Sequence, residues 1–226
     1  MSVAQHLSDI LSRIQQSASQ AGRSPSSVRL IAVSKTKPIE LIQEALHAGH
    51  IDFGENRVQE LREKHPILPQ VHWHMIGSLQ RNKVKYIAPF VHLIHSIDSE
   101  RLLAEVNKQA AKHERIINCL LQLNISEEAV KSGFEEEEVE QLLRKIDEFP
   151  HIRIMGLMGM AAFVAEEEII RQQFRRLRLA SEQFQAIEHP RIEMKELSMG
   201  MSGDFEIAIE EGATLVRIGS AVFGRR

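Results

Sequence analysis

The stretch Val28-Arg29-Leu30-Ile31-Ala32-Val33-Ser34-Lys35 decides the fold class of this 226-residue chain. It is a continuous apolar run that ends in an amine, which is typical of a strand buried on both faces of a parallel sheet. We therefore predict a strand over 28–34, with Lys35 at the edge where parallel sheets carry their active sites. A strand-end lysine also occurs without any function, when its stem packs on the sheet and its amine reaches water.

Seven further β-rich runs follow along the chain, and helical segments separate them. The predicted strands cover 28–34, 51–53, 71–76, 92–97, 118–124, 152–157, 193–197 and 215–218, and the predicted helices cover 2–21, 38–48, 58–64, 82–87, 99–113, 135–149, 166–187 and 204–211. Strict alternation of strand and helix indicates a parallel α/β sheet, and eight strands favour a closed (β/α)8 barrel of the TIM type over an open doubly wound sheet. We predict one domain over residues 1–226, with an extra helix before the first strand.

Composition limits the classes of function. The net charge of −3 gives no basic patch for nucleic acid or for an anionic membrane, so small molecules or proteins are the expected partners. The amino terminus lacks a secretory signal, and the most apolar stretch, 154–164, is too short for the roughly 20 residues of a membrane span. The single Cys119 fits a reduced compartment and a core position. We expect a cytoplasmic protein.

Two segments near the end of the chain have the features of a phosphate cradle. Met201-Ser202-Gly203-Asp204 follows the seventh strand and opens a helix, where Ser202 and backbone N–H groups can meet an anion. Gly219-Ser220 follows the eighth strand, so it combines a close backbone approach with a hydroxyl. A helix cap explains either segment alone, but barrels bind phosphate at both places. Together with the amine of Lys35, this pair suggests pyridoxal phosphate.

Other side chains are expected at the same mouth of the barrel. Asn56 follows the second strand, His74 and Ile76 belong to the third, and Arg217 lies two residues before Gly219, so that it shares a strand face with the phosphate loop. An ion pair elsewhere in the barrel is the alternative role for Arg217. The methionines of 155–160, together with Met199 and Met201, are expected in the pocket wall or the core.

A metal site is considered at the third strand. His72 and His74 are two residues apart and therefore share a strand face, which raises zinc as a possibility. No further Cys, His or carboxylate has ligand spacing around them, so we predict no metal. The acidic runs 135–138 and 166–168 open predicted helices, where carboxylates interact favourably with the helix dipole, and we assign them no chemistry.

Nearly the whole chain resembles the family of pyridoxal 5′-phosphate homeostasis proteins. The resemblance is carried by Val33-Ser34-Lys35, Phe53-Gly54-Glu55-Asn56, 73–83, Lys131-Ser132-Gly133, Gly156-Leu157-Met158, 197–202, 216–220 and Phe223-Gly224. The barrel of this family is similar to the N-terminal domain of alanine racemase. The resemblance therefore implies a fold-type III pyridoxal-phosphate barrel, without the C-terminal β-domain that racemases carry.

The same resemblance implies a role for each site residue. It implies that Lys35 holds the cofactor as a Schiff base and that Arg217 faces the pyridine nitrogen. The complete set expected to bind the cofactor is Lys35, Asn56, His74, Ile76, Ser198, Met199, Met201, Ser202, Arg217, Gly219 and Ser220, with Ser202, Gly219 and Ser220 on the phosphate and Asn56 and Ser198 near the cofactor. We expect Lys35 to be buried in the barrel mouth, because desolvation favours the neutral, nucleophilic amine.

The expected function is binding without turnover. A racemase of this fold uses a tyrosine of its second domain as the acid or base on the far face of the cofactor, whereas this chain ends at Arg226 and its one tyrosine is Tyr86. We expect a carrier that buffers pyridoxal phosphate or delivers it to pyridoxal-phosphate-dependent apoenzymes, as a monomer or weak dimer. The alternative is an enzyme, either an amino-acid racemase of low activity or a Schiff-base aldolase. A purely structural scaffold would leave the phosphate loops unexplained.

Overall fold

The computed structural model describes residues 2–126 and 133–224 and forms a closed barrel of eight parallel strands. The strands are β1 Arg29–Val33, β2 Asp52–Glu55, β3 His72–Met75, β4 Leu93–Ile97, β5 Ile117–Gln122, β6 Ile152–Met158, β7 Ile192–Ser198 and β8 Leu215–Ile218. They pair in sequence order, and β1 closes the ring by pairing with β8, Ile31 opposite Arg217. The prediction of a (β/α)8 barrel is confirmed. The family segment Lys131-Ser132-Gly133 falls largely outside the described residues.

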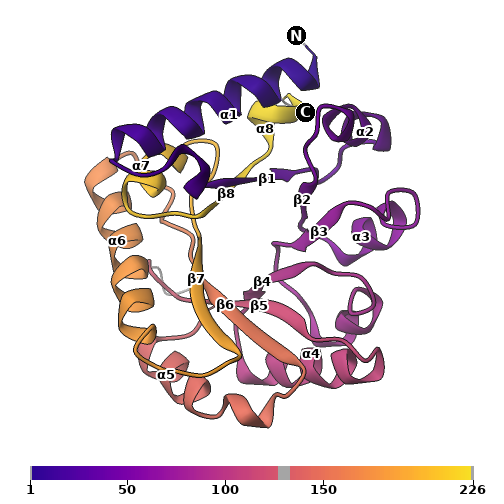
Figure 1. Ribbon diagram of the computed structural model, residues 1–226, viewed down its shortest axis with the longest axis vertical. Helices are drawn as coiled ribbons and strands as arrows, with labels where there is room; N and C mark the ends of the chain where they lie inside the picture. The colour runs from indigo at the N-terminus through magenta and orange to yellow at the C-terminus, as the bar shows by residue number, and fades with distance from the viewer. Residues whose placement is uncertain (1, 127–132, 225–226) are drawn as a thin grey trace.

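Helices surround the ring of strands (Figure 1). They are α1 Val3–Gln20, α2 Ile39–His47, α3 Val58–Lys64, α4 Glu100–Lys112, α5 Glu136–Arg144, α6 Glu167–Phe184, α7 Phe205–Glu210 and α8 Ser220–Phe223, with 3-10 turns η1 Pro25–Ser27, η2 Arg81–Tyr86 and η3 Ile146–Glu148. Side-chain caps fix several starts: the hydroxyl of Ser99 accepts from the N–H of Leu102, and Glu135 and Glu138 form a capping box.

Three helix predictions need correction. The segment 82–87 is a 3-10 helix rather than an α-helix, and the predicted helix 135–149 divides into α5 and η3. The short helix α8 directly follows β8, at a place where only a phosphate loop is predicted from the sequence. The extra amino-terminal helix is present as α1, which lies across α7 and α8 (Figure 1). None of the helices in the described part of the chain is long and apolar enough to cross a membrane.

The barrel wall separates two apolar layers. Inside the ring, one small cluster comprises Ile31, Val33, Ile76, Leu93, Leu120, Met158 and Leu215. Outside it, a larger layer between strands and helices contains the fully buried Phe53 and Trp73. Cys119 lies in this outer layer, where burial raises the pKa of its thiol, so it serves as a core residue as expected. Side chains inside the ring therefore alternate with side chains that anchor helices.

Glycine is required where β6 meets β7. Gly156 has a φ of +151°, and a Cβ there would lie 1.9 Å from the carbonyl oxygen of Glu196. The register between the two strands also shifts between Ile154 and Gly156. This close approach sets the upper part of β7, so that Ser198 pairs with Met158 near the end of the barrel where the cofactor site is expected.

Candidate cofactor site at the carboxyl-terminal mouth

A cavity of about 230 Å³ opens at the carboxyl-terminal ends of the strands. Its lining comprises Val33, Lys35, Asn56, Ile76, Met160, Met201, Ser202, Arg217, Gly219 and Ser220. Most of the residues predicted to bind a cofactor therefore lie together, although they come from opposite ends of the chain. Val33 was not predicted, yet strand alternation could have found it, since it lies two residues before Lys35.

Three predicted residues do not line this cavity. Met199 is fully buried in the outer apolar layer, because the preceding residue, Ser198, faces the inside of the ring and successive side chains alternate. His74 is fully buried within the ring, and neither it nor Ser198 belongs to the cavity lining. Met199 thus takes the core position that was the other role expected of it, and His74 lies below the cavity, whereas Ser198 contacts the cavity-lining Arg217.

Lys35 lies on the rim of the cavity. It follows the end of β1 by two residues, and the next residue, Thr36, has a φ of +60°, so the backbone turns as soon as it leaves the strand. Lys35 is exposed, and the expected burial is wrong. Within the described part of the chain no group is hydrogen-bonded to its amine, whereas the amine of Lys37 donates to the carbonyls of Phe223 and Gly224 at 3.2 and 2.9 Å. Lys35 is thus the free amine at this mouth.

A buried ion pair fixes the backbone on the amino-terminal side of Lys35. The ammonium of Lys64 on α3 donates to the carboxylate of Glu55 at 2.7 Å and to the carbonyl of Ser34 at 2.9 Å. The hydroxyl of Ser34 donates to the same carboxylate oxygen at 2.7 Å. Both groups of Ser34 are therefore held next to Lys35, and the charges of Glu55 and Lys64 are almost completely buried.

The same network continues on the other side of Lys35. The carboxylate of Glu60 accepts from the backbone N–H of Thr36 at 2.7 Å and from the ammonium of Lys64 at 2.9 Å. Burial raises the pKa of Glu55 to about 7, and the nearby ammonium of Lys64 opposes that rise. This network was not predicted from the sequence, where Glu55 appeared only as part of a family segment. A buried ion pair between a strand and a helix leaves no recognisable pattern in the neighbouring residues.

The two predicted phosphate loops meet across the cavity. The hydroxyl of Ser220 donates to the hydroxyl of Ser202 at 3.3 Å, and both residues are exposed to the cavity mouth. At Gly219, a Cβ would come within 3.0 Å of the carbonyl oxygen of Val33, so glycine permits β8 and β1 to close tightly. The buried Oδ1 of Asn56 has no hydrogen-bond partner among the described residues. Two hydroxyls, a free amine and an unpaired amide oxygen around one cavity fit a small phosphorylated aldehyde such as pyridoxal phosphate.

Arg217 forms the charged part of the cavity lining. Its Nη1 donates to the carbonyl and the hydroxyl of Ser198 at 2.7 and 2.6 Å, and its Nη2 donates to the carbonyl of Gly159 at 3.1 Å. Burial lowers the pKa of Arg217 to about 10, with the carboxylate of Asp204 opposing the change, so the guanidinium remains cationic at neutral pH. Three oxygen atoms of the barrel wall thus fix its position.

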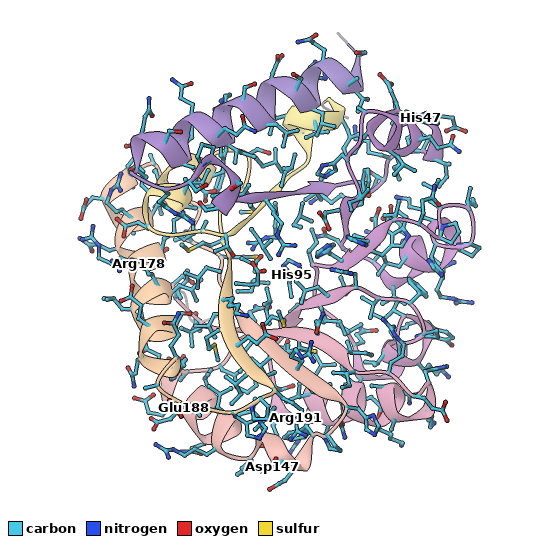
Figure 2. The ribbon with its side chains drawn as sticks, viewed as in Figure 1. His47, His95, Asp147, Arg178, Glu188 and Arg191 are labelled. Atoms are coloured by element: carbon cyan, nitrogen blue, oxygen red, sulfur yellow. The ribbon has the colours of Figure 1, made fainter. Side chains whose placement is uncertain are left out.

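A chain of hydrogen bonds continues from Arg217 into the ring. The hydroxyl of Ser198 is 2.8 Å from Nδ1 of His95, and Nε2 of His95 is 3.0 Å from Nδ1 of His74. Figure 2 shows His95 among the strands at the centre of the molecule. Burial lowers the pKa of both imidazoles, so both are neutral at physiological pH. These polar side chains link the cofactor cavity with the opposite mouth of the barrel.

Comparison with known proteins first identifies the class of barrel. The family model described as "Alanine racemase, N-terminal domain" matches residues 6–226. A crystal structure of an unknown protein from Bifidobacterium adolescentis superposes with a TM-score of 0.93 at 36% identity, covering 98% of this chain and 94% of that one. The fold is therefore that of the alanine racemase N-terminal domain.

Full-length relatives then identify the family. The pyridoxal phosphate homeostasis protein of Aquifex aeolicus is 41% identical over 228 residues, which cover 100% of this chain and 99% of the relative. The structure of PipY from Synechococcus elongatus, described with PLP bound, has a TM-score of 0.83 at 33% identity and covers 98% of this chain and 100% of that one. This chain belongs to the pyridoxal phosphate homeostasis protein family.

Proposed function

We propose that this protein binds pyridoxal phosphate in the cavity at the carboxyl-terminal mouth, with a covalent bond to Lys35, and that it stores the cofactor and delivers it without turnover. The single observation that carries the proposal is the free amine of Lys35 beside the paired hydroxyls of Ser202 and Ser220. The relative from Synechococcus elongatus, described with PLP bound, supports the identity of the ligand.

When bound, pyridoxal phosphate supplies an aldehyde carbon that condenses with a primary amine and releases water. In this proposal Lys35 presents that amine, while the hydroxyls of Ser202 and Ser220 donate to the phosphate in charge-assisted hydrogen bonds. Gly219 lets the backbone approach the phosphate closely. The amide of Asn56 and the side chains of Ile76 and Met201 orient the ring in the cavity. Ser198 acts through Arg217, whose position it holds.

In this proposal Arg217 makes the bound cofactor ring a weaker electron acceptor. A guanidinium that faces the pyridine nitrogen disfavours a proton there, and an unprotonated ring is a weaker electron acceptor. Racemases share this arginine, so its presence alone decides nothing about turnover.

The described cavity lining offers only Lys35 and Arg217 as titratable groups. Racemisation requires proton transfer on both faces of the substrate, so a second acid or base is needed opposite Lys35. Tyr86 lines a neighbouring groove instead, where the guanidinium of Arg62 lies 4.4 Å from its ring centroid. The proposed chemistry is therefore reversible attachment and release of the cofactor at an exposed lysine.

The setting of this function is proposed to be the cytoplasm. The single cysteine is buried, and the chain has no basic surface signature for nucleic acid. We propose that residues 1–226 act as one domain, as a monomer or weak dimer, and that pyridoxal-phosphate-dependent apoenzymes receive the cofactor. An exposed Lys35 suits such transfer, because a small amine or water reaches the bond without opening of a lid.

The test combines transfer and turnover in one preparation. The cofactor-loaded protein is supplied to an apoenzyme that requires pyridoxal phosphate, and separately incubated with L- and D-alanine and serine in deuterated water. We expect recovery of the apoenzyme's activity and no exchange of the Cα proton. Racemisation at about 1 to 10³ turnovers per second, the usual enzymatic range, would establish the racemase alternative. Failure of transfer together with absence of turnover would contradict delivery and leave storage alone.

A further inference from the structure

The amino-terminal mouth of the barrel carries an unusual set of polar side chains. Asp52 on β2 and His74 on β3 lie beside His92, the residue before β4, and one potential ligand atom from each lies within 4.8 Å of the others. Interiors of (β/α)8 barrels are mostly filled by branched apolar residues. A carboxylate with two or more imidazoles is therefore not explained by core packing, and these groups lie at the end of the barrel away from the cofactor cavity.

The distances are close to those of a metal site. Oδ1 of Asp52 is 3.2 Å from Nε2 of His74, and 3.1 Å from Nδ1 of His72. Four ligands held at about 2.0–2.2 Å around a zinc ion lie about 3.3–3.6 Å from one another. The ring of His92 stacks on that of His72 with centroids 4.2 Å apart, and one of its nitrogens lies within 4.8 Å of ligand atoms of Asp52 and His74. Three ligand atoms, from Asp52, His74 and His92, thus surround one position, and His72 beside Asp52 is a candidate fourth ligand.

The remaining nitrogen of His74 has the partner that a metal-binding histidine requires. Its Nδ1 is 3.0 Å from Nε2 of His95, whose own Nδ1 is 2.8 Å from the hydroxyl of Ser198. Histidine ligands almost always donate their second N–H to such a partner, which fixes the tautomer and the plane of the ring. With His74 held in this way, Nε2 faces Asp52 and is available as a ligand.

Charge and access also suit a cation. Asp52 is the carboxylate of the cluster, and the nearby guanidinium of Arg29 is paired with the carboxylate of Glu196, which also accepts from Thr214. His74 is completely buried, but the side chain of His72 is 42% exposed and provides an entrance from solvent. An ion can therefore reach the site without passing through the barrel.

We propose that Asp52, His74 and His92 bind a divalent transition-metal ion of the zinc class at the amino-terminal mouth, with His72 or water as the fourth ligand. In the sequence, His72 and His74 have no further ligands at metal-binding spacing, which is why no metal was predicted there. The structure supplies them from neighbouring strands, Asp52 from β2 and His92 at the start of β4. The proposal is independent of pyridoxal phosphate.

The test uses Co²⁺ as a spectroscopic substitute for Zn²⁺ on the full chain, after treatment with a chelator. We expect one Co²⁺ per chain, with the intense visible d–d bands of four-coordination, and displacement by Zn²⁺. His92→Ala and Asp52→Asn should each weaken binding at least 100-fold, more than the roughly 10- to 100-fold that loss of an outer hydrogen-bond partner costs. Thermal unfolding in chelator checks that both variants are folded.

His47→Ala is the matched control. His47 is exposed at the end of α2, on the periphery of the molecule in Figure 2, and its loss should leave the spectrum and the affinity unchanged. Weak Co²⁺ binding in the wild type, or binding that survives both His92→Ala and Asp52→Asn, would overturn the proposal. Loss in only one of these variants would overturn the three-ligand assignment.

Discussion

The two mouths of the barrel are built in different ways. At the carboxyl-terminal mouth, Lys35, Ser202 and Ser220 follow the ends of strands and are exposed, the first two on loops and Ser220 at the start of α8. At the amino-terminal mouth, Asp52 and His74 belong to the strands themselves, and His74 is fully buried. The first mouth presents its polar groups to solvent, whereas the second holds its polar groups against one another in a fixed arrangement.

The difference shows how one barrel accommodates two kinds of polar chemistry. Loops tolerate exposed reactive groups, because the barrel below them supplies the stability. Polar groups inside the ring need partners, since an unpaired buried polar atom costs on the order of 1–3 kcal/mol. The hydrogen bonds from Arg217 through Ser198 and His95 to His74 satisfy that need and join the two mouths.

The largest expected effect concerns Lys35. Lys35→Ala should abolish the covalent adduct that borohydride traps, because it removes the free amine of the cavity. Mass spectrometry of the reduced protein should locate the adduct on Lys35 in the wild type. Lys195→Ala, which removes an exposed lysine of β7 paired with Glu193, is the control and should retain the adduct. An adduct on Lys37 or Lys83 in the wild type would contradict the assignment.

The next effect concerns the buried ion pair beside Lys35. Lys64→Met leaves the carboxylate of Glu55 buried without its cation, so the free energy of unfolding should fall by about 3–5 kcal/mol, measured by urea denaturation. The double variant Glu55→Met with Lys64→Met removes both charges and should recover most of that loss. A double variant as unstable as the single one would show that packing around α3, and not the unpaired charge, causes the loss.

A smaller effect is expected in the phosphate cradle. Ser220→Ala should weaken pyridoxal phosphate binding by about 1.5–3 kcal/mol, because the hydroxyl is expected to donate to a charged acceptor. The binding of pyridoxal, which has no phosphate, should be weaker from the start and should change little in the variant. Equilibrium dialysis of both ligands measures the difference. Equal affinity of the wild type for both would rule out the cradle.

The smallest effect is a pH dependence at the opposite mouth. Burial lowers the pKa of His92 from 6.5 to about 4, so the unfolded chain binds the extra proton first. The contribution of His92 to stability is full above about pH 6.5 and is lost as the pH falls to about 4. Its size is on the order of 1 kcal/mol or less, because solvent screens a half-exposed imidazole. In chelator, His92→Asn should flatten the curve of unfolding free energy against pH in this range; an unchanged curve would contradict the assignment.

The fold could be predicted from the sequence because strand and helix alternate at regular intervals, and eight parallel strands can close into a barrel that has no exposed sheet edge. Boundaries were less predictable. The segment after β3 has helical periodicity, but in the structure Arg81–Tyr86 is a 3-10 turn, since tertiary context overrides weak local preference. The break between α5 and η3 likewise follows no breaker residue in the sequence.

Site residues could be predicted where a position directly after a strand is enough to place them at the mouth of the barrel. Lys35, Asn56, Ser202, Gly219 and Ser220 follow strand ends, so a barrel brings them to one mouth whatever its detailed register. The choice between pocket wall and core for Met199 could not be made from the sequence, because the face on which a strand residue lies depends on the phase of the alternation, and an error of one residue inverts it. The cluster of Asp52, His74 and His92 also depends on pairing between neighbouring strands, and the register of those strands is not written in any local pattern.

The seam between β8 and β1 joins two sides of the cavity that are synthesised at different times. Lys35 follows β1 and Ser220 follows β8, so the two sides of the cavity are made at opposite ends of synthesis. Lys35 has no phosphate loop beside it until β8 pairs with β1. This pairing joins residues far apart in the sequence, so its contact order is high. A ligand that bridges this seam stabilises only the closed ring, by mass action. Binding of pyridoxal phosphate across this seam is therefore expected only after the barrel has closed.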